Sequence, residues 1–466
     1  MAERGASEVE IKGLQSWGDV PAKANVIVVG GGPAGMTAAS RVKRLNPGLR
    51  VVVFERSSYV SYGQCGIPYF LGGLSRFEDL VHYPLRVFTE ERGIEVHVRT
   101  EVVEVAPGLV RARRADGSEV VYEWDRLLIA TGARPRRLNV PGAELEGVLT
   151  LRTLEDAERA QRALARAKRV AVVGAGYIGV ELAENLTRVG KEVVLFEILP
   201  QVMPTLDPEM AKLVEEELRR NGVEVHLGES VVELVGDTSV RKVVTDRGEY
   251  HVDAVLTAIG VTPEVELAKQ LGVELGRTGA VRTDSRLRTN VEGVYAAGDA
   301  AETINLVTGK PDWFPLAPVA NKMGYVAGSN LAGFAEEFPG AVGTAVTKVF
   351  GLEVGRTGLT ERKAREEGFN PVSVTVEGRS RAGYYPGSSS MTVKLIADSE
   401  TGRLLGAQIV GGEGVLARIN AAAVLISKGF TAREAFFSDL GYAPPFAPVW
   451  DPLVTAARVL LGKLRS

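Results

Sequence analysis

The same local pattern occurs twice in this chain, and the repetition limits the folds that the chain can adopt. The apolar run 26–29 leads into the turn Gly30-Gly31-Gly32-Pro33-Ala34-Gly35, a helix-like stretch and a strand-like run, 50–54, that ends at Glu55. The order recurs over 169–197, with glycines at 174, 176 and 179 and a terminal acid, Glu197. Strands that alternate with helices in this way predict α/β units built on parallel sheets.

Each glycine turn is typical of a Rossmann-like dinucleotide-binding unit. The first glycine permits a tight turn, the second lets the backbone approach a pyrophosphate, and the third lets the helix pack on the strand. The helix N-terminus offers N–H groups to phosphate, and the terminal acid can accept hydrogen bonds from ribose hydroxyls. A tight turn in another α/β fold is the alternative. The candidate cofactor residues are Gly30, Gly32, Pro33, Ala34, Gly35, Glu55 and Arg56 in the first unit, and Gly174, Gly176, Tyr177, Ile178, Gly179, Glu181 and Glu197 in the second.

The similarity between the two units continues downstream. Residues 93–98 resemble 222–227, and 129–133 resemble 257–261, which indicates an internal duplication. His97 and His226 occupy matching strand positions, which favours a packing role over a catalytic one. We therefore add the turn residues Ala130, Thr131, Gly132 and Gly260 to the candidate nucleotide sites.

A third signal follows the second unit. The strand-like run 294–297 leads into Gly298-Asp299, where the chain could re-enter the first unit. Asp299 could bind ribityl or pyrophosphate oxygens, although Gly-Asp is also ordinary turn chemistry. Ala317, near the start of a helix expected over 314–331, is a further candidate. Two dinucleotide sites in one chain suit a flavin and a nicotinamide, because hydride enters through one and electrons leave through the other.

The composition narrows the function classes. The net charge of −3 does not suggest a nucleic-acid surface, and no apolar run of 18 or more residues suggests a membrane span. Residues 1–24 form an arm without the apolar core of a signal peptide. One cysteine excludes an intramolecular disulfide and fits a reducing, cytoplasmic compartment. We expect no structural or catalytic metal.

The single cysteine lies in the polar loop 61–69, between Gly63 and Gly66. A buried structural cysteine is the alternative, but the loop is unlike a core strand. A helix N-terminus directly after Cys65 could lower the thiol pKa. Without a second cysteine, the sulfur can form a mixed disulfide with a small thiol, a persulfide or a sulfenic acid.

From residue 24 to the end, the chain resembles the single-cysteine branch of the FAD-dependent pyridine-nucleotide disulfide reductases, and within it the coenzyme A disulfide reductases. The motifs that carry this resemblance are the two glycine turns with their acids, the loop 61–69, the turns 130–135 and 297–299, and the segments 384–387 and 442–452. The resemblance implies an FAD domain (25–145 and 276–340), an NAD(P)H domain (146–275) and a C-terminal α+β dimerisation domain (341–466). It also implies a homodimer in which Cys65 lies against the flavin and the partner subunit closes the site. In the third domain we expect a half-exposed sheet with strands over 344–350, 372–377, 392–398 and 404–410.

Two departures from related branches refine this resemblance. NADH peroxidases and oxidases of this branch carry a histidine in the first glycine turn, where this chain has Pro33. Two-cysteine reductases use a C-terminal histidine, but all four histidines here precede residue 252. The resemblance instead implies that the partner subunit supplies Tyr442 and one of Tyr384 and Tyr385, of which we favour Tyr384. A phenol is a plausible acid for a leaving thiolate, and interface packing is the alternative.

The helix after the first glycine turn carries a candidate substrate surface. Thr37, Arg41 and Arg44 follow at i, i+4 and i+7 and so share one face. The resemblance places this face at a coenzyme A channel, with Ser61 and Gln64 near the pantetheine sulfur. A solvated basic face is the alternative.

The expected reaction is FAD-dependent reduction of coenzyme A disulfide, or a related small disulfide, by NAD(P)H through a Cys65 mixed disulfide. Tyr177 resembles the family's residue that moves aside for nicotinamide. We expect NADH to be preferred over NADPH, because Glu197 would repel a 2′-phosphate and no arginine follows it. The alternatives are an NADH oxidase, a polysulfide or persulfide reductase, and an electron carrier for a protein partner.

Overall fold

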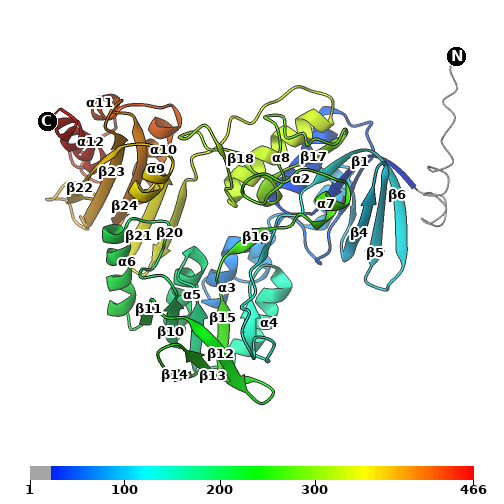
Figure 1. Cartoon of the computed structure of the whole chain (residues 1–466), viewed down its shortest axis with the longest axis horizontal. Helices are drawn as coiled ribbons and strands as arrows, with labels where there is room; N and C mark the ends of the chain where they lie inside the picture. The colour runs from blue at the N-terminus through cyan, green and yellow to red at the C-terminus, as the bar shows by residue number, and fades with distance from the viewer. Residues whose placement is uncertain (1–21, 466) are drawn as a thin grey trace.

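The computed structural model describes residues 22–465, and its chain is arranged as three α/β or α+β units (Figure 1). The first and third units lie at opposite sides of the view in Figure 1, and the second lies below and between them. Most of the expected arm, residues 1–21, falls outside the described residues. Residues 22–24, which we assigned to that arm, already belong to the first strand. No helix among residues 22–465 is long and apolar enough to cross a membrane.

The first unit is built on a seven-stranded sheet in the order β3-β2-β1-β6-β5-β4, with β17 paired to β6. Its parallel strands are β1 (Ala22–Val29), β2 (Val51–Phe54), β3 (Glu95–His97), β6 (Glu119–Ile129) and β17 (Val294–Ala296); β4 (Thr100–Ala106) and β5 (Leu109–Arg114) are antiparallel. The chain thus returns to this sheet at β17, after the second unit. The short strands β18 (Thr303–Ile304) and β19 (Pro311–Asp312) form a hairpin beyond it.

Two long helices pack together on the first unit, α2 (Pro33–Leu45) and α8 (Ala317–Leu331). They approach closely because α8 presents glycines at the crossing. A Cβ on Gly324 would lie 2.3 Å from the Ala34 carbonyl oxygen, and one on Gly328 would lie 2.6 Å from that of Ala38. The close crossing places residues 321 and 325 of α8 beside the face of α2 that carries Thr37 and Arg41.

The second unit repeats the arrangement with a five-stranded parallel sheet in the order β11-β10-β9-β15-β8. The strands expected over 169–173 and 192–197 have the bounds that the sequence predicts. The elements are β8 (Val148–Thr150), β9 (Arg169–Val173), β10 (Glu192–Glu197), β11 (Glu224–Leu227) and β15 (Ala254–Thr257), the antiparallel β12 (Val231–Gly236), β13 (Val240–Thr245) and β14 (Glu249–His251), and the helices α4 (Leu154–Leu164), α5 (Tyr177–Arg188) and α6 (Pro208–Arg220).

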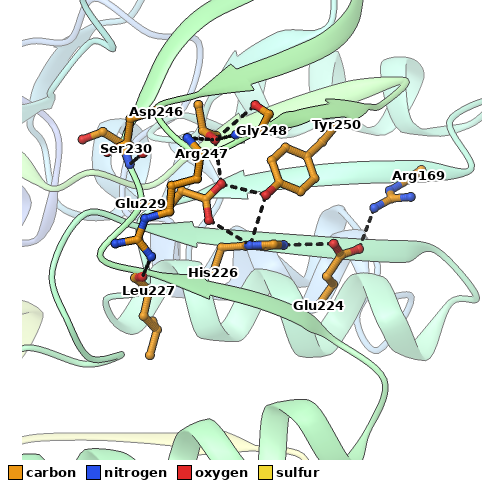
Figure 2. Close-up of polar contacts among 11 residues, drawn as sticks. Arg169, Glu224, His226, Leu227, Glu229, Ser230, Asp246, Arg247, Gly248 and Tyr250 are labelled. Carbon is orange, nitrogen blue, oxygen red and sulfur yellow. Dashed lines mark hydrogen bonds and ion pairs between the residues drawn. The ribbon is translucent and has the colours of Figure 1, made fainter.

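The duplication extends to side-chain packing around the two histidines. His97 stacks on Phe54 and His226 stacks on Phe196, both at a ring-centroid distance of 5.2 Å. Figure 2 shows His226 hydrogen-bonded to Glu224 and Glu229, with the hydroxyl of Tyr250 beside it. Both histidines thus take part in aromatic and carboxylate packing, as the matching positions predict.

The two connections between the first and second units run side by side. They pair as β7 (Ala133–Pro135) and β16 (Val261–Pro263) in a short antiparallel ladder. Directly after β16, the helix α7 (Glu266–Gln270) and the side chains of Val265 and Val273 join the core of the first unit. The chain therefore rejoins the core of the first unit at Val265, about ten residues before the domain boundary at 275 that the sequence predicts.

The third unit is a five-stranded antiparallel sheet in the order β20-β21-β24-β23-β22. The elements are β20 (Ala345–Val349), β21 (Leu352–Gly358), β22 (Pro371–Arg379), β23 (Ser390–Asp398) and β24 (Leu404–Gly411), with α9 (Glu361–Glu366), α10 (Val415–Ser427), α11 (Ala432–Phe436) and α12 (Pro452–Lys463). The sequence missed β21. The expectation of a half-exposed sheet is wrong for β24, which is buried along its whole length because α10 and α6 pack against it.

Candidate functional site

Cys65 lies on a short 3-10 turn, Gln64–Gly66, directly before the helix α3 (Ile67–Leu71). The loop before it is anchored to the first glycine turn, because the Ser61 N–H donates to the Gly31 carbonyl oxygen at 3.0 Å. Ser61 has a φ of +52°, a left-handed conformation that a non-glycine residue rarely adopts. The loop thus holds Cys65 close to the first nucleotide turn through a strained backbone position.

The surroundings of Cys65 do not stabilise a thiolate. Desolvation raises the pKa of the Cys65 thiol, and the negative charge of Glu181 raises it further, while Arg152 opposes them. The expectation that a following helix N-terminus lowers this pKa is therefore wrong, because α3 is only five residues long and desolvation outweighs it. Cys65 is nevertheless exposed in the single chain, so a small sulfur compound can reach it.

Asp299 is held beside the first glycine turn. It lies on the 3-10 turn Gly298–Ala300, and a Cβ on Gly298 would stand 2.8 Å from the Ala34 side chain. Its carboxylate contacts Arg152 Nη2 at 3.1 Å, and its carbonyl accepts the Trp313 indole N–H at 2.8 Å. The structure thus brings Asp299 to the first nucleotide turn and adds Arg152, which the sequence did not single out.

The two terminal acids make the same pair of backbone hydrogen bonds in their units. Glu55 accepts from the N–H groups of Gly31 and Ser57, both at 2.7 Å. Glu197 accepts from Ala175 at 2.8 Å and from Leu199 at 3.0 Å. Each carboxylate oxygen has a second lone pair that can accept from a ribose hydroxyl.

The space in front of both glycine turns fits a dinucleotide. Around a Cβ built on Gly32 or Gly176 there is no atom of the described chain within 4 Å. Neither α2 nor α5 has a side-chain cap at its N-terminus, so the first N–H groups are available to phosphate. By contrast, a Cβ on Gly35 would lie 1.9 Å from the Gly30 carbonyl oxygen. Only glycine at this position lets the helix pack this closely on the turn. The residue types and shape at both turns suit a pyrophosphate.

The other candidate cofactor residues surround these two turns. Thr131 donates to the Glu264 carbonyl oxygen at 2.6 Å, which ties the two connections together. Tyr177 begins α5 and has a buried hydroxyl without a hydrogen-bond partner among the described residues. The remaining members are Pro33 and Ala34 in the first turn of α2, the exposed Arg56 after Glu55, Ala130, Gly132 and Gly260 in the connections, Ile178, Gly179 and Glu181 on α5, Gly174 before it, and Ala317 at the start of α8.

A pocket of about 310 Å³ opens beside α2, and four of the five predicted substrate residues line it. These are Thr37, Arg41, Arg44 and Ser61, whereas Gln64 is not part of its wall and instead lies 3.5 Å from the Tyr62 hydroxyl. The shared helix face thus forms one wall of a pocket, and its role in substrate binding stays a prediction.

Sequence reasoning missed the other half of this pocket. Arg92 lines it with Tyr83, and its guanidinium lies 5.0 Å from the Tyr83 ring centre. Tyr325 of α8 lies 4.1 Å beneath the guanidinium of Arg41. His82 is also in the wall. Helical spacing could find only the residues of α2, because the others come from distant parts of the chain.

The tyrosines of the third unit form a pair at its surface. The hydroxyl groups of Tyr384 and Tyr442 lie 3.4 Å apart, while the Tyr385 ring lies near the guanidinium of Arg381. Tyr384 is 78% exposed and Tyr442 is 47% exposed in the single chain. Among residues 22–465, neither phenol hydroxyl forms a hydrogen bond with Cys65 or with the loop that carries it.

Comparison with known proteins assigns both the nucleotide-binding units and the C-terminal unit to the same protein family. Residues 24–324 match the family described as pyridine nucleotide-disulphide oxidoreductase, and residues 344–453 match its dimerisation domain. A Pyrococcus abyssi protein named NAD(P)H sulfur oxidoreductase (CoA-dependent) is 48% identical over 444 residues, which are 95% of this chain and 99% of that protein. A Pyrococcus horikoshii NAD(P)H coenzyme A polysulfide/persulfide reductase is 48% identical over 441 residues, 94% and 98% of the two chains. A solved NAD-dependent persulfide reductase from A. fulgidus is similar with a TM-score of 0.92 and 39% identity, covering 94% of this chain and 83% of that one.

Proposed function

Because the chain belongs to the pyridine nucleotide-disulphide oxidoreductase family, whose members use FAD and NAD(P)H, we propose that it reduces a sulfur–sulfur bond in a coenzyme A compound. The substrates are coenzyme A disulfide and coenzyme A persulfide. The first reaction converts NAD(P)H, one proton and the disulfide into NAD(P)⁺ and two coenzyme A thiols. The second converts NAD(P)H, one proton and the persulfide into NAD(P)⁺, coenzyme A and hydrogen sulfide.

The observation that carries this proposal is the charge of the pocket beside the Cys65 loop. Arg41, Arg44 and Arg92 line it, and its wall contains no carboxylate. Guanidinium groups without a carboxylate partner are suited to phosphate, and coenzyme A carries three phosphate groups. Ser61 belongs both to the pocket wall and to the loop 61–69 that carries Cys65, so a ligand held by its phosphates here has its thiol arm beside the sulfur.

The chain's own groups then supply the sulfur chemistry. The Cys65 thiolate attacks one sulfur of coenzyme A disulfide, forms a mixed disulfide and releases one coenzyme A thiolate. Tyr442 of the partner subunit, hydrogen-bonded to Tyr384, donates the proton to that leaving thiolate. FAD, when bound, supplies the two electrons of NAD(P)H that cleave the mixed disulfide and release the second coenzyme A. Gly32 and Glu55 would hold the FAD, and Gly176 and Glu197 would hold the NAD(P)H.

The same mechanism determines the oligomeric state and the preferred nicotinamide nucleotide. A homodimer is required, because the exposed tyrosine pair acts on the partner's site. NADH is the preferred donor, because the strand that ends at Glu197 continues into Ile198 and Leu199, without an arginine that could pair with a 2′-phosphate.

Kinetics with two disulfides test the substrate. Coenzyme A disulfide carries phosphates, whereas the disulfide of pantetheine has the same thiol arm without them. Arg44→Gln should raise KM for coenzyme A disulfide at least tenfold and leave KM for the pantetheine disulfide within twofold, because a hydrogen bond to a charged group contributes about 1.5–3 kcal/mol. The control is Arg114→Gln on β5, whose guanidinium contacts Ser118 far from the pocket. Equal losses with both disulfides would contradict a phosphate-binding role.

The intact mass of the denatured protein tests the intermediate. The purified chain should carry an adduct of coenzyme A mass, which a thiol reductant removes and which Cys65→Ser lacks. An unmodified or merely oxygenated Cys65, together with NADH consumption that depends only on oxygen, would favour an NADH oxidase. Undiminished electron transfer to a protein acceptor by the Cys65→Ser variant would favour a carrier.

A further inference from the structure

One buried guanidinium in the third unit connects the two segments that carry the tyrosine pair. Arg418 lies on α10 and is 5% exposed. Its Nε and Nη2 donate to one carboxylate oxygen of Asp451, both at 2.9 Å. Nη2 also donates to the Ser380 carbonyl oxygen at 2.9 Å, and Nη1 donates to that of Gly414 at 2.9 Å. A single side chain therefore forms hydrogen bonds with three separate segments of the chain: with two backbone carbonyl groups and with the carboxylate that caps α12.

Two of these partners lie at the roots of the tyrosine segments. Ser380 directly follows β22 and begins the loop that carries Tyr384. Asp451 ends the irregular segment that carries Tyr442, and its second oxygen caps α12 through the Leu453 N–H at 2.8 Å. Between the two segments themselves, the structure has the phenol contact and one long backbone hydrogen bond, from Ala382 N to Pro444 O at 3.2 Å. Arg418 is thus the strongest described link between them.

The local backbone is shaped around this guanidinium. Gly414 has a φ of +75°, and a Cβ there would lie 2.5 Å from Arg418 Nη1. Only glycine leaves room for the guanidinium and adopts this conformation without strain. The planar fork of arginine can bond the three partners at once, whereas the single ammonium of lysine cannot match that geometry.

We propose that Arg418 is a positioning residue that sets the spacing of Tyr384 and Tyr442, and so prepares the proton donor that one subunit presents to the other. This inference rests on the proposed function, in which Tyr442 protonates the leaving thiolate. It assigns to α10, which carries neither tyrosine, a role in the sulfur half of the reaction. The other half of the reaction, in which NADH reduces the flavin, uses groups of the first and second units. Its rate should therefore not depend on Arg418.

A double-mutant cycle tests the proposal. Arg418→Lys should lower kcat/KM for coenzyme A disulfide at least tenfold, with flavin reduction by NADH within twofold of the unaltered protein. In a Tyr442→Phe background, Arg418→Lys should change kcat/KM less than twofold, because residues that act as one unit are not additive. In Arg418→Lys, the alkaline limb of the pH profile of kcat/KM should also move to lower pH. The hydrogen bond with Tyr384 is the main cause that raises the pKa of Tyr442, so weakening this bond lowers that pKa.

The matched control is Arg403→Lys in the same unit, where the guanidinium donates to the Leu306 carbonyl oxygen away from the tyrosines. Equal losses from Arg418→Lys in both backgrounds, or a loss no larger than that of Arg403→Lys, would overturn the positioning role while the proposed function stands. If Tyr442→Phe itself changes nothing, the proposed acid is wrong and the positioning role falls with it. Should Arg418→Lys fail to fold, Asp451→Asn replaces it, because asparagine retains the cap of α12 but removes the ionic partner.

Discussion

The Thr347 hydroxyl of the third unit donates a 2.6 Å hydrogen bond to Glu181 Oε1 on α5 of the second unit. Glu181 is a largely desolvated carboxylate, and its desolvation raises its pKa, while the bonds from Thr347 and Tyr69 oppose that rise. Tyr69 lies on α3, one helical turn beyond Cys65. The three residues therefore connect the cysteine helix, the proposed nicotinamide-binding helix and the dimerisation domain.

Thr347→Val should move the pH dependence of flavin reduction by NADH. Removal of the hydroxyl deletes a hydrogen bond to the ionised form of Glu181, of a kind that contributes about 1.5–3 kcal/mol. The pKa of Glu181 rises further, so the acidic limb of the profile shifts to higher pH. Stopped-flow reduction across a pH series measures the shift. Thr347→Ser retains the hydroxyl and serves as the control; identical profiles for the valine and serine variants would contradict the role of this bond.

The reactivity of Cys65 should respond to two charged neighbours in opposite directions. Glu181 raises the pKa of the thiol and Arg152 lowers it, so Glu181→Gln should favour the thiolate and Arg152→Gln should disfavour it. At a fixed, mildly alkaline pH, alkylation by iodoacetamide should be faster in the first variant and slower in the second. The chain has one cysteine, so no other thiol contributes.

The control for this experiment is Arg159→Gln, an exposed arginine of α4 that pairs with Asp156 and is not among the main causes of the shift in the Cys65 pKa. A shift of the same sign in the Glu181 and Arg152 variants would show that their electrostatic effects on the sulfur are not the cause.

Nucleotide choice should depend on the residue after Glu197. Ile198 is 67% exposed, so a longer side chain at this position has free access to the end of β10. We expect kcat/KM to be at least tenfold higher for NADH than for NADPH. Ile198→Arg should reduce this difference, because the new guanidinium can pair with the 2′-phosphate of NADPH. Ile198→Gln is the control for size. A clear NADPH preference of the unaltered protein would contradict this assignment.

A buried lysine at the joint between the second and third units should contribute strongly to stability. Lys394 is 1% exposed and contacts Asp207 at 3.0 Å, Glu361 at 2.8 Å and Glu209. Lys394→Met removes the buried counter-charge that these carboxylates share, although Arg365 still pairs with Glu361, and should cost about 3–5 kcal/mol of unfolding free energy. Denaturant unfolding measures the loss. Lys269→Met, which breaks an exposed ion pair with Glu266, should cost less than about 1 kcal/mol.

The same cluster predicts an acid limit of stability. Desolvation raises the pKa of Glu361, but the hydrogen bonds from Lys394, Ser373 and Arg365 and the charge of Lys394 outweigh it and lower that pKa from 4.5 to about 2. A carboxyl group with a depressed folded-state pKa stabilises the protein above its unfolded-state pKa and loses that contribution as the pH falls towards the folded value. The melting temperature should therefore fall between about pH 4.5 and pH 2. In Lys394→Met, protonation of Glu361 should instead relieve repulsion, so the slope in this range should be shallower or reversed.

Much of the nucleotide-binding architecture could be predicted from the sequence because its signals are local. The glycine spacing, the β-branched run before it and the acid at the end of the next strand all lie within about 30 residues, and β9 and β10 have the predicted bounds. The shared face of Thr37, Arg41 and Arg44 follows from helical periodicity alone. By contrast, β21 was missed, and the cysteine pKa was predicted in the wrong direction, because both depend on what packs around them.

By itself, the sequence determined the repeated glycine-turn units, the position of the only thiol and the helix face beside it, since each is encoded by residue type and short-range spacing. Only the tertiary structure decided that Arg92 and Tyr325 complete the pocket, that Tyr384 rather than Tyr385 lies beside Tyr442, and that Arg418 connects their segments. Those contacts join residues far apart in the chain. Their partners are selected by which helices and loops pack together, and no local periodicity encodes that packing.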